Sequence, residues 1–130
     1  MCIRDRLTWP ANFICVMPST IQAGGPALPA VYGHGLLGDA SEVEGASFSD
    51  KVSEDMMGCA TDWLGLDSND IPEVIGVLGN LSEFETVVDQ MLQGFVNFQF
   101  LGRLINSPDG FGTSSAFKDG SCLLYTSRCV

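Results

Sequence analysis

The two ends of the chain limit how much of it can be interpreted as a folding unit. Residues 1–5, MCIRD, can be translated from ATG TGT ATA AGA GAC, which resembles the transposase mosaic end used to fragment DNA for sequencing. Residues 122–127, CLLYTS, can be translated from the reverse complement of that element, and residues 128–130 from the element again. Because one DNA element accounts for both ends, we interpret residues 1–6 and 122–130 as adapter-derived and exclude them from fold prediction.

The remaining segment, residues 7–121, has 115 residues, which is enough for one domain of about 100 to 200 residues. Exclusion of the ends removes one acidic residue and three arginines from 16 acidic and 6 basic residues, leaving 15 and 3, a net charge of −12. Such a surface repels phosphate backbones, so we expect no nucleic-acid partner. No segment approaches about 18 consecutive apolar residues, so we expect no transmembrane segment.

Two of the five cysteines, Cys15 and Cys59, lie within residues 7–121. They are compatible with one disulfide in an exported protein or with two buried thiols, and their spacing alone does not decide between these. We favour an extracellular or periplasmic location, in which case a signal peptide would have been lost with the natural start. We predict that the two cysteines lie near each other, and a Cα separation beyond about 7 Å would exclude a disulfide.

Short β-branched and aromatic runs predict three strands. Residues 13–17 predict a buried strand that ends at Pro18, residues 30–32 predict a second strand, and residues 57–61 predict a third. We expect the first and third strands to flank the second in one sheet. The glycines and prolines within residues 21–29 predict a loop before the second strand.

Helical signals follow the second and third strands. Ser41 and Glu44 fit a capping box, which predicts a weakly amphipathic helix from there toward Met57. Pro72 is typical of the first turn of a further helix, which should end near residues 79–80.

The clearest predicted element is a long helix that begins near Phe84. Ser82 and Glu85 form a second capping-box pattern, and apolar residues recur at helical spacing until Pro108. The apolar face is broad, which predicts a helix buried on more than one side through core packing. Where the sheet is incomplete, we expect one flank of this helix to be uncovered and apolar. Residues 113–121 are interpreted as a loop with no strand after it.

Two turns carry a resemblance to a known family. GHGLLG, residues 33–38, follows the second predicted strand, and DWLGLDS, residues 62–68, follows the third, in an α/β arrangement. Over residues 13–68 their order and spacing resemble the α/β-hydrolase family, and the inserted helices resemble its secreted bacterial esterase and lipase branch. The resemblance implies that residues 7–121 are a partial domain with an incomplete three-layer α/β-hydrolase-like sheet and long helices.

The resemblance also implies an oxyanion-hole turn formed by Gly33, His34 and Gly35. It places one oxyanion donor at the backbone N–H of Leu36, with Leu37 as the neighbouring candidate. The triad histidine of this fold comes late in the chain, after the nucleophile and the acid. We therefore expect His34, the one histidine of the sequence, to orient the turn through hydrogen bonds.

The nucleophile of this family lies in a G-x-S-x-G motif, which the sequence lacks. Ser114 and Ser115 lie in GTSSA, without the second glycine or a preceding strand, and are poor substitutes. We therefore expect this fragment to lack the nucleophile, acid and base, and to be inactive. The full-length parent would act on a small-molecule or lipid ester. The alternative is a noncatalytic acidic binding or scaffold module.

Two sets of side chains carry donor atoms of the kinds that bind metal ions. The zinc-type set has no paired ligand spacing, and the calcium-type set lacks the periodicity of a calcium loop, so we expect no metal and no cofactor. The first set is Cys15, His34, Cys59 and Asp62, and the second is Asp67, Asp70 and Glu73.

Overall fold

The computed structural model describes residues 10–17, 27–45, 55–119 and 122–125. Most of the predicted loop at residues 21–29 and the later part of the helix predicted toward Met57 lie outside the described residues. So does most of the two segments that we interpret as adapter-derived.

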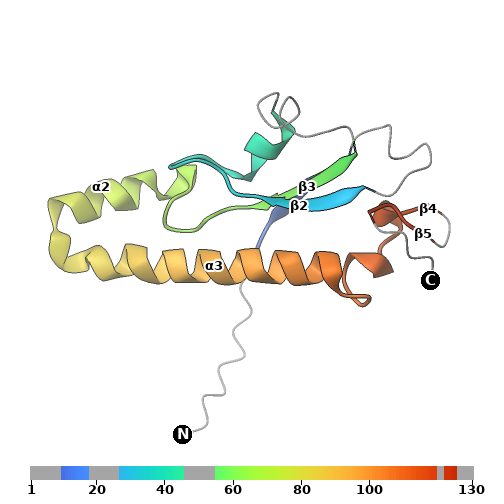
Figure 1. The fold of residues 1–130 in the computed structure, drawn as a ribbon. Helices are drawn as coiled ribbons and strands as arrows, with labels where there is room; N and C mark the ends of the chain where they lie inside the picture. The colour runs from blue at the N-terminus through green and yellow to red at the C-terminus, as the bar shows by residue number, and fades with distance from the viewer. Residues whose placement is uncertain (1–9, 18–26, 46–54, 120–121, 126–130) are drawn as a thin grey trace, which may run out of the picture.

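A small mixed sheet of three strands forms the centre of the molecule, in the order β1-β3-β2 (Figure 1). β1 (Phe13–Val16) is antiparallel to β3 (Met56–Thr61), and β2 (Leu28–Tyr32) is parallel to β3. The three predicted strands are present, although β2 begins two residues earlier than predicted. The predicted order was wrong, because β3 and not β2 lies in the middle. Its central position agrees with its burial, which is complete except at the first residue.

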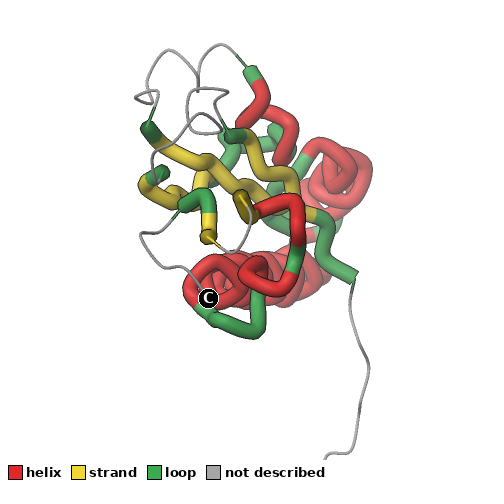
Figure 2. Tube along the Cα trace, turned by 90° about the vertical axis from the view of Figure 1, so that its right-hand side faces the viewer, coloured by secondary structure: helices red, strands yellow, loops and turns green. Residues whose placement is uncertain are grey.

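Two apolar cores lie on opposite faces of the sheet, because successive side chains of a strand point to opposite sides. Met57 and Cys59 pack toward the long helix α3 (Phe84–Asn106). Ala60 packs on the other face against the 3-10 helix η2 (Ala40–Glu44). Figures 1 and 2 show the sheet between these two helical elements. The chain therefore has mixed α/β content, with the sheet covered on both faces.

The first predicted capping box is wrong. Asp39, and not Ser41, is the N-cap of η2, and its side chain accepts a hydrogen bond from the Ser41 N–H at 2.8 Å. The helix is a short 3-10 helix that ends when the Gly45 N–H donates to the Glu42 carbonyl. Aspartate is a strong N-cap acceptor, so the residue immediately before η2 takes the role that we gave to Ser41.

Two α-helices follow β3. α2 (Ile71–Gly79) has its proline in the first turn and ends at Gly79 with Asn80 as its C-cap, as predicted. α3 begins at Phe84 after a 3-10 turn (Leu81–Glu83), and no side chain caps it. The second predicted capping box is therefore also wrong: the Asn80 side chain accepts a hydrogen bond from the Ser82 N–H, so Asn80 and not Ser82 provides the cap.

α3 buries one stripe rather than several sides. Its buried residues recur every three, four or seven positions, which is the spacing of one helix face. They are Val87, Gly94, Asn97, Leu101 and Ile105. The prediction of burial on more than one side is therefore wrong for the described residues. The expected uncovered apolar flank is present, and it consists of Phe84, Val88, Leu92, Phe95, Val96, Phe100 and Leu104.

The C-terminal segment contains a second, two-stranded sheet, so the prediction of a loop without a strand is wrong. β4 (Lys118–Asp119) pairs with β5 (Cys122–Leu123) in antiparallel fashion. Tyr125 is buried in the core cluster that includes Cys59, and the Ala27 N–H donates to the Leu124 carbonyl at 2.8 Å. Residues that we excluded from fold prediction thus contribute to the core beside α3, although the buried Tyr125 hydroxyl has no hydrogen-bond partner among the described residues.

The two cysteines form a disulfide between neighbouring strands. Cys15 and Cys59 are direct partners in the β1–β3 register, and their Cα atoms are 4.1 Å apart. The prediction that they lie near each other is confirmed. Of the two alternatives that the spacing left open, the structure forms the disulfide and links β1 to the central strand.

Candidate functional site

The glycine turn (residues 33–38) and the acidic turn (residues 62–70) lie side by side. Both follow parallel strands, so both emerge at the carboxyl edge of the β2–β3 pair. The Leu37 N–H donates to the Leu66 carbonyl at 2.8 Å, and the Ser68 N–H donates to the Gly38 carbonyl at 2.8 Å. An isolated parallel bridge also joins Gly38 to Asp67. The two turns thus form one hydrogen-bonded layer at the edge where ligands bind in open α/β sheets.

His34 joins the two turns. Its Nε2 atom accepts a hydrogen bond from the Trp63 N–H at 2.8 Å, so its proton is on Nδ1, which lies 2.8 Å from the Gly35 carbonyl and donates to it. The side chain is 8% exposed. Because both ring nitrogens are hydrogen-bonded, His34 positions the backbone of the two turns.

The backbone N–H groups of the glycine turn differ in their partners. The Gly35 N–H donates to Glu42 Oε2 at 3.2 Å, the Gly38 N–H donates to the Gly35 carbonyl at 3.0 Å, and the Leu37 N–H is paired with Leu66. Leu36 N–H has no acceptor among the described residues. Of the two donors suggested by the resemblance, Leu37 is thus already paired, and Leu36 keeps its N–H available.

The shape of the turn depends on Leu37 as well as on the glycines. Glycine permits positive φ angles, but in the described part of this turn it is Leu37 that adopts one, with φ of 58°. The glycines provide space instead. A Cβ atom at Gly38 would lie 3.2 Å from the Gly35 carbonyl oxygen and would overlap the Glu42 carboxylate.

Glu42 is a residue of this site that the sequence pattern did not reveal. Its Oε2 atom accepts hydrogen bonds from the Tyr32 hydroxyl at 3.0 Å and from the Gly35 N–H. The hydrogen bond to Glu42 raises the pKa of the Tyr32 hydroxyl, with smaller contributions from desolvation and from the carboxylate charge. Glu42 thus ties η2 to the end of β2. Only its position, seven residues after Gly35, could have suggested this contact, and that spacing has no motif attached to it.

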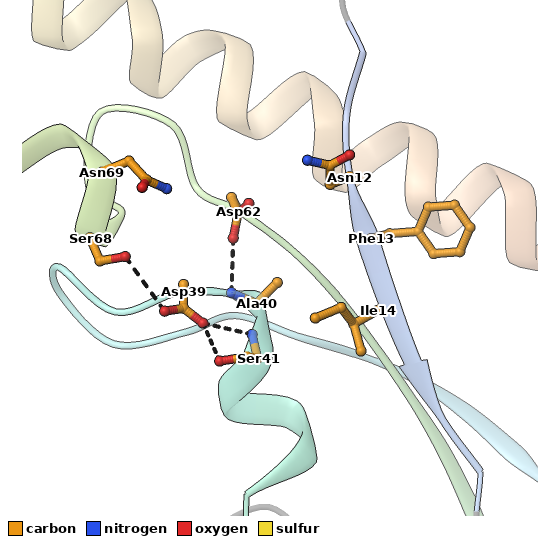
Figure 3. A pocket seen from close by; sticks show the side chains of 9 residues that line it. All are labelled: Asn12, Phe13, Ile14, Asp39, Ala40, Ser41, Asp62, Ser68 and Asn69. Atoms are coloured by element: carbon orange, nitrogen blue, oxygen red, sulfur yellow. Dashed lines mark hydrogen bonds between the residues drawn. The ribbon is translucent and has the colours of Figure 1, made fainter.

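A polar cleft opens beside the two turns (Figure 3). It has a volume of about 350 Å³ and lies between the start of β1, the start of η2 and the acidic turn. Asp62 Oδ1 accepts a hydrogen bond from the Ala40 N–H at 2.9 Å, and Asp39 accepts one from the Ser68 hydroxyl at 3.5 Å. Leu36 does not line this cleft. The available N–H of the turn and the polar cleft are therefore separate features.

Two carboxyl groups near the cleft have pKa values displaced in opposite directions. Hydrogen bonds from the Ser41 hydroxyl, and then from the Ser41 N–H, lower the pKa of Asp39. Desolvation by burial raises the pKa of Asp70 and outweighs the hydrogen bond from the Asp67 N–H. The acidic turn therefore holds a carboxyl group whose charged form is disfavoured.

The two serines near the end of the chain do not lie in the strand-to-helix turn that holds a catalytic serine in α/β-hydrolases. Ser114 caps a short 3-10 helix, where its Oγ atom accepts a hydrogen bond from the Ala116 N–H at 3.3 Å. Ser115 begins that helix. No hydrogen bond joins either serine to His34 among the described residues.

Comparisons with known proteins give no assignment: no family model, no curated protein and no solved structure matches the chain. Among the described helices, none is both long and apolar enough to cross a membrane. Within the same part of the chain, no group of three or more histidine, cysteine or acidic side chains is arranged to hold a metal ion.

Proposed function

We propose that the chain is part of a serine esterase or lipase of the α/β-hydrolase type, to which it contributes one donor of the oxyanion hole. The observation that carries the proposal is the available N–H of Leu36. It lies in a turn in which the N–H groups of Gly35, Leu37 and Gly38 are all paired. His34 fixes this turn to the neighbouring one.

An oxyanion hole requires N–H groups that are aimed in advance at the position where negative charge develops. Loss of one such donor costs about 3 kcal/mol of transition-state stabilisation. The hydrogen bonds of Leu37 and His34 restrict the backbone on both sides of Leu36, so its N–H is held in place before a substrate arrives. This is the physical role that we assign to the turn.

The second donor and the nucleophile would come from a further strand of the parent. β3 already has a neighbour on each side, whereas β2 is at the edge of the described sheet. A parallel strand added there would end beside the glycine turn, and the residue after the nucleophile would supply the second N–H. The finer assignment, an incomplete three-layer α/β-hydrolase sheet, is part of this proposal. So is the interpretation of residues 1–6 and 122–130 as adapter-derived.

The proposed substrate of the parent is a small-molecule or lipid ester, and the proposed location is extracellular or periplasmic. The disulfide between Cys15 and Cys59 supports the location, because disulfides persist in oxidising compartments.

The 130-residue chain itself should hydrolyse no ester above background, because in this proposal the nucleophile and the base belong to a part of the parent that the chain does not include. The measurement is the turnover of p-nitrophenyl acetate by the purified chain. Turnover that is lost in Ser114→Ala or Ser115→Ala would show that our placement of the missing nucleophile is wrong.

The decisive experiment uses the longer natural protein, recovered by sequencing the source DNA beyond codon 121. A predicted strand followed by G-x-S-x-G would support the enzyme, and its absence would support the noncatalytic module. In that longer protein, Leu36→Pro removes the N–H and should lower kcat by about 10² to 10³-fold. Leu36→Ala keeps the N–H and is the matched control, with little change expected. Equal effects of the two substitutions would reject the oxyanion role.

A further inference from the structure

We propose that the outer face of α3 binds a second copy of this chain, with the two α3 helices antiparallel about a two-fold axis near Gly94. Gly94 is buried, and a Cβ atom there would lie 2.7 Å from Trp63 Cδ1, so it marks the side of α3 that packs on the acidic turn. The outer face is the opposite side, which points away from the sheet in Figure 1. The proposal is independent of the esterase function, because the glycine turn is not part of this face.

The outer face carries six exposed side chains at positions that are symmetric about Gly94. A helix has about 3.6 residues per turn, so positions two residues away lie about half a turn from Gly94, and positions nine residues away about two and a half turns. Those four positions are therefore opposite Gly94, and the positions six residues away border them. The six side chains are Glu85, Val88, Leu92, Val96, Phe100 and Arg103.

The pattern of these side chains is self-complementary when the direction of the helix is reversed. Reversal about Gly94 exchanges Leu92 with Val96, and it exchanges the two bordering apolar positions with each other. It also exchanges Glu85 with Arg103, so that an acidic position meets a basic one. In a two-fold symmetric dimer every contact occurs twice, as residue i with residue j and as j with i. A face with this symmetry fits a second copy of itself.

The charges of the outer face have no complement within the chain. Glu85 and Arg103 are both on α3, about 27 Å apart along its axis at about 1.5 Å per residue, so they cannot pair with each other. The Arg103 guanidinium lies 5.8 Å from the centroid of the Phe100 ring and forms no ion pair among the described residues. Asp89, one turn after Glu85, adds a like charge, which is unfavourable at this spacing. When antiparallel helices pack about 8 to 10 Å apart, each Arg103 side chain lies opposite the Glu85 of the other copy.

The expected dimer is weak and depends on concentration. Contact along one pair of helices is at the low end of protein interfaces, below about 1,200 Å² in total. The net charge of −10 also opposes association. The antiparallel register is favoured over others, because it places the one cationic side chain of α3 next to acidic side chains. We therefore expect a dissociation constant in the micromolar range.

The first measurement is sedimentation velocity of the full 130-residue chain between about 1 and 200 μM. The chain should pass from monomer to dimer within this range, and added salt should weaken the dimer because it screens the ion pairs. A chain that stays monomeric throughout, or that forms only species larger than a dimer, would overturn the inference. A monomer would instead favour coverage of the outer face by a further part of the parent.

Charge reversal then tests the register. Glu85→Arg should weaken the dimer by at least about tenfold, because two like-charge pairs replace two ion pairs. Glu44→Arg is the matched control, since it changes the net charge equally at an exposed residue of η2, on the other face of the sheet, and it should not weaken the dimer.

Mixing two variants provides a rescue. Arg103→Glu alone should also weaken the dimer, but an equimolar mixture of the Glu85→Arg and Arg103→Glu chains should restore it, because each arginine then faces a glutamate. All substituted side chains are exposed, so the fold should be kept, and circular dichroism checks this. The inference is wrong if Glu85→Arg weakens the dimer no more than Glu44→Arg does, or if the mixture associates no better than its components.

Discussion

The carboxyl edge of the sheet and the outer faces of α2 and α3 differ in how well their side chains are accommodated. At the carboxyl edge of β2 and β3, the buried polar side chains His34, Thr61 and Asp67 all take part in hydrogen bonds. On the outer faces of α2 and α3, large apolar side chains such as Ile75 and Leu92 are more than half exposed. The polar groups of the turns thus find partners on neighbouring segments, with the buried Trp63 Nε1 atom as an exception. The large side chains of the helical flank remain exposed.

This difference separates local from non-local requirements. A hydrogen bond in a turn needs partners a few residues away or on the next turn, and both turns are within the described chain. Burial of a leucine or phenylalanine side chain contributes about 1.5 to 3 kcal/mol, but only if another layer is present. The exposed flank therefore contributes less to stability than it would if another layer covered it. The substitutions below test this difference between the turns and the flank.

The largest effect on the free energy of unfolding should come from the disulfide, which links β1 to β3 in the sheet from which both turns emerge. Cys15 and Cys59 are 44 residues apart, and closure of a loop of that length stabilises a fold by about 2 to 4 kcal/mol. The double variant Cys15→Ser and Cys59→Ser should lose that amount in urea unfolding. Reduction and alkylation of the wild-type chain should give the same loss. A loss below about 1 kcal/mol would mean that packing alone holds β1 against β3.

Alanine substitutions at two glycines should distinguish the two faces of α3, with a smaller effect on the free energy of unfolding. A Cβ atom at Gly94 would lie 2.7 Å from Trp63 Cδ1 and 3.0 Å from the Leu64 nitrogen, so Gly94→Ala should cost about 1 to 3 kcal/mol. A Cβ atom at Gly102 would meet nothing within 4 Å, so Gly102→Ala should stabilise by about 0.5 to 1 kcal/mol. Thermal unfolding of both variants measures the contrast, and equal shifts would mean that α3 does not pack tightly against the acidic turn.

The same contrast explains which parts of the structure could be predicted. The strands β1, β2 and β3, the proline at the start of α2 and the end of α3 follow from local propensity and were predicted from the sequence. Both capping boxes were wrong because Asp39 and Asn80 compete for the same N–H groups, and the sequence pattern does not rank such neighbours.

The site was predicted in part. The turn, its histidine and its neighbour follow from the residues 33–38 and 62–68, but the role of Glu42 and the polar cleft depend on how η2 lies against the sheet. The order of the strands also required three-dimensional information, because alternation within a strand does not specify its neighbours. The burial of Tyr125 was missed because we excluded its segment before considering its packing.

Polar substitutions on the helical flank should alter self-association of the chain far more than its free energy of unfolding. Ile75 is 64% exposed and Leu92 is 58% exposed, so replacing both with glutamine should change the free energy of unfolding by less than about 0.5 kcal/mol. The wild-type chain should aggregate or bind an apolar dye, and the double variant should do so less. Light scattering and dye fluorescence provide the measurements. A wild-type chain that is monomeric, unfolds reversibly and binds no dye would contradict the prediction that this uncovered flank promotes association.

The smallest effect should appear in the pH dependence of stability near the polar cleft. The pKa of Asp39 is lowered from its ordinary value of 3.8, so its contribution to stability is present above about pH 4 and is lost as the pH falls through the folded-state pKa. The pKa of Asp70 is raised from 3.8 by burial, so the folded state gains from protonation of Asp70 as the pH falls. Asp39→Asn should therefore reduce the loss of stability on acidification, and Asp70→Asn should increase it. Urea unfolding at several values between about pH 3 and pH 6 distinguishes these slopes. If both substitutions changed the slope in the same direction relative to the wild-type chain, burial of Asp70 would not outweigh its hydrogen bond from the Asp67 N–H.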